Sequence, residues 1–235
     1  MSIHKGLKFF ATQPHECSYL PEQKATTLFM DPQVTVNQTL YSTLADMGFR
    51  RSGRHIYRPH CHQCQECIPI RIPVCQFEIR RSQRKSWNRN IDLTVHEQEA
   101  RYTDEYYQLY QQYINTCHKD GDMYPATVEQ FCNFLAESPE FCKFYEFRLK
   151  GELVAVCVVD ILETGLSAIY TFYNPDHARR SLGCYCILWL IEAAKNRGYD
   201  YLHLGYWVKN CRKMKYKVEY RPTQLYINQS WSELR

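Results

Sequence analysis

The order of strands and helices between residues 141 and 207 constrains the fold more than any other feature of the sequence. Three successive segments have the alternating or continuously apolar pattern of β-strands, and short Lys-Gly and Glu-Thr-Gly turns separate them: residues 141–149, 152–162 and 166–173. A loop then leads into an apolar helix over about 182–196, and YLHLGYW follows as a further strand. This order predicts a mixed α/β (α+β) fold with a mainly antiparallel sheet.

Several shorter segments are also regular. Residues 103–117 and 127–137 are predicted helices, because each follows a threonine N-cap and the first carries an apolar and tyrosine stripe. Nearer the N-terminus we expect a helix over 35–47 and a hairpin at FRRSGRHIYR. The segment IPIRIPV (68–74) contains two prolines, which predicts an edge strand or an extended segment.

The strand–strand–loop–helix–strand order of residues 152–205 is similar to the core of the acetyltransferase-like (GNAT) fold. We therefore predict two domains: a small Cys-containing N-terminal domain over residues 1–75, and a GNAT-like domain over residues 76–235. Fold analogy alone assigns no function, so the function must come from particular residues.

The composition is that of a globular protein. Hydrophobic residues make up 45% and charged residues 23% of the 235-residue chain, which excludes a disordered or collagen-like chain. No apolar run is long enough to span a membrane. The first residues, MSIHKGLKFFATQPHEC, lack the apolar core and cleavage site of a signal peptide, so we expect a cytoplasmic protein.

The strongest local motif is the spaced triplet Cys61-x2-Cys64-x2-Cys67. Three thiolates at this spacing can converge on one metal ion or cluster, and Cys17 is the best candidate for a fourth ligand. A closed four-ligand site would suit structural zinc, and the same spacing occurs in chains that hold iron–sulfur clusters. The alternative is a set of ordinary reduced thiols near a strand.

Basic residues gather in two stretches, 71–90 and 209–221, and in the loop before the 182–196 helix, although the net charge is only +4. The candidates for tRNA or other RNA contacts are Arg80, Arg81, Arg84, Lys85, Arg179, Arg180, Lys213, Lys215 and Lys217. Neutralisation of phosphates beside aromatic side chains is what RNA binding requires. The alternative is that each run is a solvated face of the protein.

The loop sequence Arg180-x-x-Gly183-x-Tyr185 matches only in part the loop with which acyl-CoA enzymes hold a pyrophosphate at a helix N-terminus. A tyrosine stands where a small residue would allow close approach, which argues against coenzyme A. A second polar loop, HKDGDMYP, begins at His118 and contains Asp120 and Asp122. These side chains are candidates for acid–base catalysis, and the alternative is a turn braced by its aspartates.

The sequence resembles the bacterial aspartate/glutamate leucyltransferases, which belong with the arginyl-tRNA–protein transferases. The resemblance rests on ordered motifs that cover nearly the whole chain, among them FFATQPHECSYLPEQKATTLF, MGFRRSGRHIYRPHCHQCQECIPIRIPV, HKDGDMYP, LSAIYTFYNPD, RRSLGCYCILW and LGYWVKNCRKMKYK. It implies transfer of leucine from leucyl-tRNA to the N-terminal α-amine of proteins that begin with Asp or Glu. The added leucine would then be a degradation signal of the N-degron pathway.

The resemblance also implies roles for particular residues. The acceptor's acidic side chain needs a cation, and Arg51 and Arg71 lie in the matching motifs, where they could grip a carboxylate in a bidentate manner. Because the aminoacyl ester is already activated, the chemistry requires no cofactor. A modest acid–base group is enough, and we expect Asp122, in preference to Asp120, to take the proton from the attacking amine.

One departure from the family pattern concerns the cysteines. The eukaryotic arginyl members have Cys-Gly-Tyr-Cys at the first motif, where this chain has Cys17-Ser18-Tyr19-Leu20, so their cluster ligands cannot be transferred residue by residue. The departure favours the leucyl branch. Two other functions stay open from the sequence: a CoA-dependent N-acetyltransferase of the same fold, and a non-enzymatic, metal-bearing RNA-binding protein.

Overall fold

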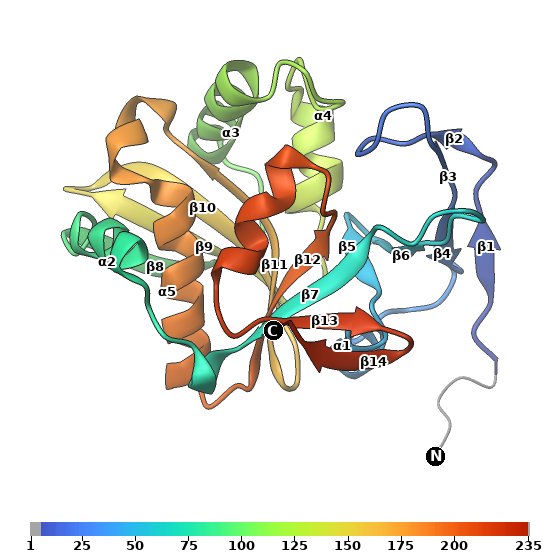
Figure 1. The fold of residues 1–235 in the computed structure, drawn as a ribbon. Helices are drawn as coiled ribbons and strands as arrows, with labels where there is room; N and C mark the ends of the chain where they lie inside the picture. Colours follow the sequence, from blue (N-terminus) through green and yellow to red (C-terminus); the bar gives the residue numbers. More distant parts are fainter. Residues whose placement is uncertain (1–5, 235) are drawn as a thin grey trace.

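A large eight-stranded sheet organises the protein, as seen in a computed structural model that describes residues 6–234 (Figure 1). In spatial order its strands are β14 (Ser230–Glu233), β13 (Gln224–Ile227), β7 (Ile68–Pro73), β12 (Tyr201–Trp207), β11 (Gly165–Tyr173), β10 (Glu152–Ile161), β9 (Cys142–Leu149) and β8 (Leu93–Glu99). Neighbours are antiparallel except β11 and β12, which are parallel. Helix α5 (Leu182–Asn196) connects that parallel pair.

Helices cover both faces of this sheet. One core contains α5 side chains, and α2 (Arg81–Asn88) packs beside α5. The other core contains side chains of α3 (Asp104–Cys117) and α4 (Val128–Phe131), which a π-helical turn extends over Cys132–Ala136. Strand β10 contributes Val154 and Cys157 to the first core, and Val156 and Val158 to the second. Burial on both faces explains its continuous apolar sequence.

A smaller N-terminal part packs against one end of the large sheet (Figure 1). It holds a four-stranded sheet of β1 (Phe9–Ala11), β4 (Thr27–Met30), β6 (His55–Pro59) and β5 (Arg50–Ser52), together with α1 (Gln38–Asp46) and the two-stranded pair β2 (His15–Glu16) and β3 (Lys24–Ala25). Its core joins Tyr41 and Phe49 to Phe141 and Leu162 of the larger part. The two parts therefore share a hydrophobic core.

Most of the predicted elements are present. The mixed α/β class with a mostly antiparallel sheet is confirmed, as are the helices expected over 103–117 and 182–196 and the hairpin at FRRSGRHIYR. For 68–74 we expected an edge strand or an extended segment: the segment is extended, but it is not at an edge, because β7 lies between β12 and β13. Pro69 and Pro73 lie outside the two residue pairs that β7 makes with β13, so their missing N–H groups cost that pairing nothing.

The position of β7 also bears on the expected boundary at residue 75. This strand falls within the N-terminal range 1–75, yet it is an interior strand of the large sheet. The division into two domains stays a prediction. Among residues 6–234, no helix has the length and apolar character needed to cross a membrane.

Candidate active site

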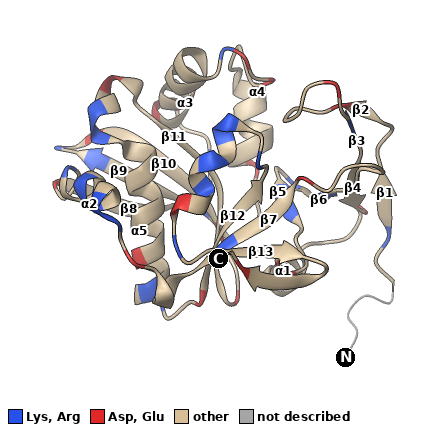
Figure 2. Cartoon of the chain, viewed as in Figure 1, with Lys and Arg blue, Asp and Glu red and all other residues tan. Residues whose placement is uncertain are grey.

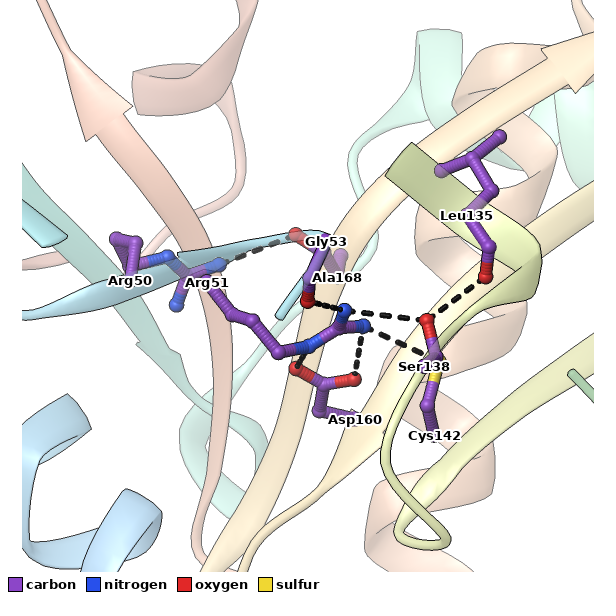
Figure 3. Close-up of polar contacts among 8 residues, drawn as sticks. All are labelled: Arg50, Arg51, Gly53, Leu135, Ser138, Cys142, Asp160 and Ala168. Atoms are coloured by element: carbon purple, nitrogen blue, oxygen red, sulfur yellow. Dashed lines mark hydrogen bonds and ion pairs between the residues drawn. The ribbon is translucent and has the colours of Figure 1, made fainter. Parts of the chain in front are cut away.

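The parallel strands β11 and β12 pair over only three residues and then diverge. The paired register runs from Gly165 with Tyr201 to Ser167 with His203. Beyond it, a side chain donates to one carbonyl group on each strand. Arg50 Nη2 donates to the Ala168 carbonyl on β11 (3.1 Å), as drawn in Figure 3. On β12 the backbone shifts register between His203 and Tyr206, where it contains Gly205 in a left-handed conformation (φ +81°).

A second side chain donates to a backbone carbonyl on the other strand. Lys217, on the 3₁₀ helix η4 (Arg212–Glu219), donates from Nζ to the Tyr206 carbonyl (2.6 Å), opposite the contribution of Arg50. Burial first and the charge of Arg50 second lower the pKa of Lys217 to about 7, against a smaller opposing effect of Cys211. A lysine close to its titration point therefore lines the opening between the strands.

Arg51 points away from this opening and is fully buried (Figure 3). Its Nε and Nη2 atoms donate to the two carboxylate oxygens of Asp160, each at 2.7 Å, and Nη1 donates to the Gly53 carbonyl (2.6 Å). The expected role of Arg51 in gripping the acceptor carboxylate conflicts with this geometry, because Asp160 already occupies the bidentate face. Arg51 instead joins β5 to β10.

Arg71, the second residue expected to bind the acceptor, is also engaged. Its guanidinium stacks over the ring of Tyr201 at 3.5 Å and that of Trp231 at 4.2 Å. Nε donates to Gln224 (2.8 Å) and Nη1 to Asp46 (3.2 Å). With 9% of its side chain exposed, Arg71 fastens β7 to its neighbours and offers no free fork to a substrate.

The loop that begins at His118 lies where three parts of the chain meet. Both carboxylate oxygens of Asp120 accept from Lys213 on η4, at 2.9 and 2.8 Å. Asp122 accepts from Ser18 of the N-terminal part (3.3 Å). These contacts bring together residues that are 93 and 104 positions apart in the sequence.

The three candidate proton-transfer groups of this loop differ in their surroundings. The hydrogen bond from Lys213 lowers the pKa of Asp120, which is exposed and ionised at neutral pH. Burial, with a smaller effect of Lys213, lowers the pKa of His118 despite the opposing charge of Asp120. His118 Nε2 lies 3.0 Å from the Tyr113 hydroxyl. Asp122 is exposed, with Ser18 as its recorded side-chain partner.

The basic residues separate into paired and unpaired groups, and Figure 2 shows many of them along α2 and around η4. Arg80 pairs with Glu219, Arg180 with Asp92 and Lys213 with Asp120. Lys217 is directed into the strand opening. The remaining candidates are exposed, and no ion pair is found for them within the described chain: Arg81, Arg84, Lys85, Arg179 and Lys215.

A hollow of about 500 Å³ next to the N-terminus of α5 is lined by Arg89, Arg179 and Arg180. Arg89 and Arg180 hold the loop in place by donating to the Arg179 and Arg89 carbonyls, at 3.0 and 2.8 Å. Ser181 precedes the helix in a left-handed conformation (φ 56°). This arrangement places positive charge at the partly matching pyrophosphate loop.

The four cysteines expected to bind a metal line one pocket of about 910 Å³ in the N-terminal part, together with Tyr19 and Tyr57. They do not converge as a ligand set: across residues 6–234 no group of three or more His, Cys, Asp or Glu side chains is placed to hold an ion. Cys17, Cys61, Cys64 and Cys67 are all free thiols. The closed four-thiolate site stays a prediction: the four thiols surround one pocket, but their present geometry is not that of a ligand set.

Sequence reasoning missed Arg50 and Gly205. Arg50 adjoins Arg51 in the same motif, and successive residues of a strand point to opposite faces, so the two side chains could not share one ion-pair partner. The motif therefore indicated that the two arginines face different surroundings, but not which of them forms the ion pair. Gly205 carried a weaker signal, a glycine inside a strand pattern, which often marks a bulge or a close approach.

Comparison with known proteins defines the class of the chain. Models of the N terminus and the C terminus of arginine-tRNA–protein transferases match residues 15–85 and 105–227. The chain therefore belongs to the arginine-tRNA–protein transferase family, an aminoacyltransferase family, which confirms the resemblance drawn from the motifs.

Within that family, two similar curated relatives are aspartate/glutamate leucyltransferases. The aspartate/glutamate leucyltransferase of Pseudomonas fluorescens (strain Pf0-1) is 55% identical over 96% of both chains. That of Pseudomonas putida (strain KT2440) is 55% identical over 97% of both. Among solved structures, that of L-PGS from Bacillus licheniformis has a TM-score of 0.48 at 15% identity, and the match covers 62% of this chain and 48% of that one.

Proposed function

We propose that this protein transfers leucine from leucyl-tRNA to the α-amine of proteins that begin with Asp or Glu, and so marks them for the N-degron pathway. The observation that carries the proposal is the 55% identity, over 97% of the chain, to a relative named for that activity. An aminoacyl-tRNA donor implies a cytoplasmic location. The two-domain division, with a Cys-containing unit over 1–75 and a GNAT-like unit over 76–235, belongs to the same proposal.

The parallel pair β11 and β12, with helix α5 between them in the chain, supports a GNAT-like interpretation of the larger unit. The pairing of the two strands ends at Ser167 and His203, and the acceptor is proposed to bind beyond that point. The aminoacyl ester is already activated and an N-terminal amine has a pKa near ~8, so the protein's main task is to position two large substrates. The reaction needs no cofactor for its chemistry.

A proton must leave the attacking amine, and the loop that begins at His118 is proposed to accept it. His118 is neutral at pH 7 because burial lowers its pKa, and Asp120 is held as an anion by Lys213. Asp122 is proposed as the proton acceptor because Ser18 is its recorded side-chain partner and it remains exposed. The contact with Ser18 would also let the N-terminal part fix the loop.

The tRNA is proposed to contact the exposed basic side chains of α2, η4 and the loop before α5. Arg81, Arg84 and Lys85 all lie in the eight-residue helix α2. Arg179 lines the hollow next to the N-terminus of α5. Arg80, Arg180 and Lys213 already pair with carboxylates and would contribute less. Such contacts to phosphates fix position and make binding depend on salt.

The direct test is incubation with labelled leucyl-tRNA and peptides that differ only in the first residue. We expect label on peptides that begin with Asp or Glu, and none on those that begin with Asn or Gln. A wild-type protein that labels none of the four would refute the proposal. Calorimetry with acetyl-CoA tests the alternative N-acetyltransferase, which requires measurable binding of that cofactor.

A further inference from the structure

Two cationic side chains from different elements converge where β11 and β12 separate. The position that a Cβ atom would take at Gly205 lies 3.7 Å from Lys217 Nζ and 3.8 Å from both Nε and Nη2 of Arg50. The guanidinium of β5 and the amine of η4 therefore both lie within 4 Å of one point. Because residue 205 has no side chain, no Cβ atom stands beside the two cations.

The positive charge at this point is not balanced within the described part of the protein. Arg50 is only 5% exposed, and its one recorded side-chain hydrogen bond goes to the neutral Ala168 carbonyl. No carboxylate of residues 6–234 forms a salt bridge with Arg50 or Lys217. A buried charge without a partner is costly, so this arrangement favours a bound anion.

The other ionisable groups around the two cations do not supply that anion. They are the hydroxyls of Tyr41, Tyr57 and Tyr206, the imidazole of His203 and the thiol of Cys211. Burial raises the pKa of each of these tyrosines and lowers that of His203, so all four are neutral at pH 7. None of these four groups therefore supplies a negative charge to balance the two cations.

We propose that Arg50 and Lys217 bind the side-chain carboxylate of the acceptor protein's first residue. A carboxylate has two oxygens in one plane, so one can accept from the Arg50 fork while the other accepts from Lys217. An Asn or Gln side chain of the same shape would turn an NH₂ group toward one of the cations. This inference rests on the proposed leucyl transfer and names the group that recognises its acidic acceptor.

Ala168, Gly205 and Lys217 are each partly exposed, so the site lies at the protein surface. The acceptor's α-amine is attached to the same residue as the bound carboxylate. Binding of that side chain by Arg50 and Lys217 would therefore hold the α-amine close to the same site. Positioning of this kind is a large part of what the reaction requires.

The experiment measures binding of labelled peptides that begin with Asp or with Asn, by fluorescence anisotropy and without tRNA. We expect the wild-type protein to bind the Asp peptide at least about tenfold more tightly. Arg50→Gln and Lys217→Gln should each weaken Asp-peptide binding by roughly 10- to 100-fold and leave Asn-peptide binding unchanged. Gly205→Ala keeps both charges but adds a methyl group within 4 Å of them and strains the backbone at φ +81°, so it should weaken Asp-peptide binding as well, and its melting temperature is measured alongside.

The matched control is Arg54→Gln, in the same hairpin as Arg50, whose side chain is 75% exposed and pairs with Glu137 at 3.4 Å. It should leave the Asp-to-Asn affinity ratio unchanged. The affinity for leucyl-tRNA is measured on every variant. Should Arg50→Gln fail to fold, Lys217→Gln decides the question.

Three outcomes would overturn the inference: equal binding of both peptides by the wild type, an unchanged affinity ratio in folded variants, or a loss confined to leucyl-tRNA affinity. The last would identify a site for a tRNA phosphate. These outcomes are distinct from failure of the proposed function, in which the wild type transfers no leucine. In that case the binding measurements still decide whether the site takes an acidic N-terminus.

Discussion

Arg50 and Arg51 are adjacent in β5 and almost equally buried, at 5% and 3% exposure, yet their electrostatic surroundings are opposite. Arg51 donates two hydrogen bonds to Asp160, whereas Arg50 faces Lys217 and a backbone carbonyl. The alternation of a β-strand sends the two side chains to opposite faces. Neighbouring residues of one type can therefore serve separate needs, one in assembly and one in recognition.

The contrast between cations with and without a carboxylate partner recurs elsewhere in the molecule. Lys213 and Arg180 have carboxylate partners, while Lys217 and the α2 cations have none recorded among residues 6–234. Paired charges join distant segments, such as the His118 loop and η4. A buried charge without a partner lowers stability. Features of this kind are expected mainly at functional sites.

Breaking the buried pair should have the largest effect on stability. Asp160→Asn leaves the Arg51 charge without a carboxylate in a site with no exposure, which we expect to lower the free energy of unfolding by about 3–5 kcal/mol. Arg50→Gln removes a charge that has no carboxylate partner, so its effect should stay within about 1 kcal/mol. Urea unfolding of both variants measures the difference, and equal decreases would contradict the contrast between the two arginines.

Removing unpaired surface charges should have the next largest effect, on tRNA binding. Replacing Arg81, Arg84 and Lys85 together by Gln should weaken leucyl-tRNA binding and lower its salt slope by roughly one unit for each phosphate that is no longer neutralised. Arg80→Gln, which removes a residue already paired with Glu219, should change the slope by less than Arg81→Gln. An unchanged slope in the triple variant would make α2 a solvated face.

The sequence alone predicted much of the fold, because periodicity reports burial directly. The stripe over residues 103–117 and the apolar run of β10 both follow from packing against the sheet. Helix α2 was not predicted, since Trp87 is the one apolar residue of RSQRKSWN and the buried side chains of the helix are the polar Gln83 and Ser86. The interior position of β7 was missed because two prolines suggested an edge strand. Which N–H groups of a strand must form hydrogen bonds depends on the register of its neighbours, and the sequence of the strand does not show that register.

The candidate site was less predictable, because it depends on contacts between distant segments. Asp160 lies 109 residues after Arg51, and nothing local to the motif says which arginine it pairs with. Lys217 was grouped with Lys213 and Lys215, yet a 3₁₀ helix turns one of the three inward. The resemblance to a family supplied the reaction but could not choose among these side chains.

The two aspartates of the His118 loop differ in the same way, because Asp120 pairs with a cation and, within residues 6–234, Asp122 does not. The expected difference is in catalysis and is smaller. Asp122→Asn should lower single-turnover leucyl transfer by at least about tenfold while tRNA affinity and melting temperature stay unchanged. Asp120→Asn removes the partner of Lys213, so its main effect should be on the loop's attachment to η4. Near-normal transfer by Asp122→Asn, or its simple unfolding, would assign Asp122 a structural role.

The smallest expected effect is a dependence of acceptor recognition on pH. Lys217 has a pKa of about 7, so it loses its proton as the pH rises above 7 in the free protein. A bound carboxylate favours the protonated amine, so the Asp-to-Asn affinity ratio should fall several-fold as the pH rises from about 7 to 9. The Asn peptide corrects for the peptide's own α-amine, whose pKa is near ~8.

Two variants separate Lys217 from other titrating groups in this measurement. In Lys217→Gln the Asp-to-Asn affinity ratio should be low and independent of pH. In Arg50→Gln the neighbouring positive charge that lowers the pKa of Lys217 is gone, so the remaining decline should move to higher pH. A decline that persists unchanged in Lys217→Gln would mean that another group controls recognition of the acidic side chain.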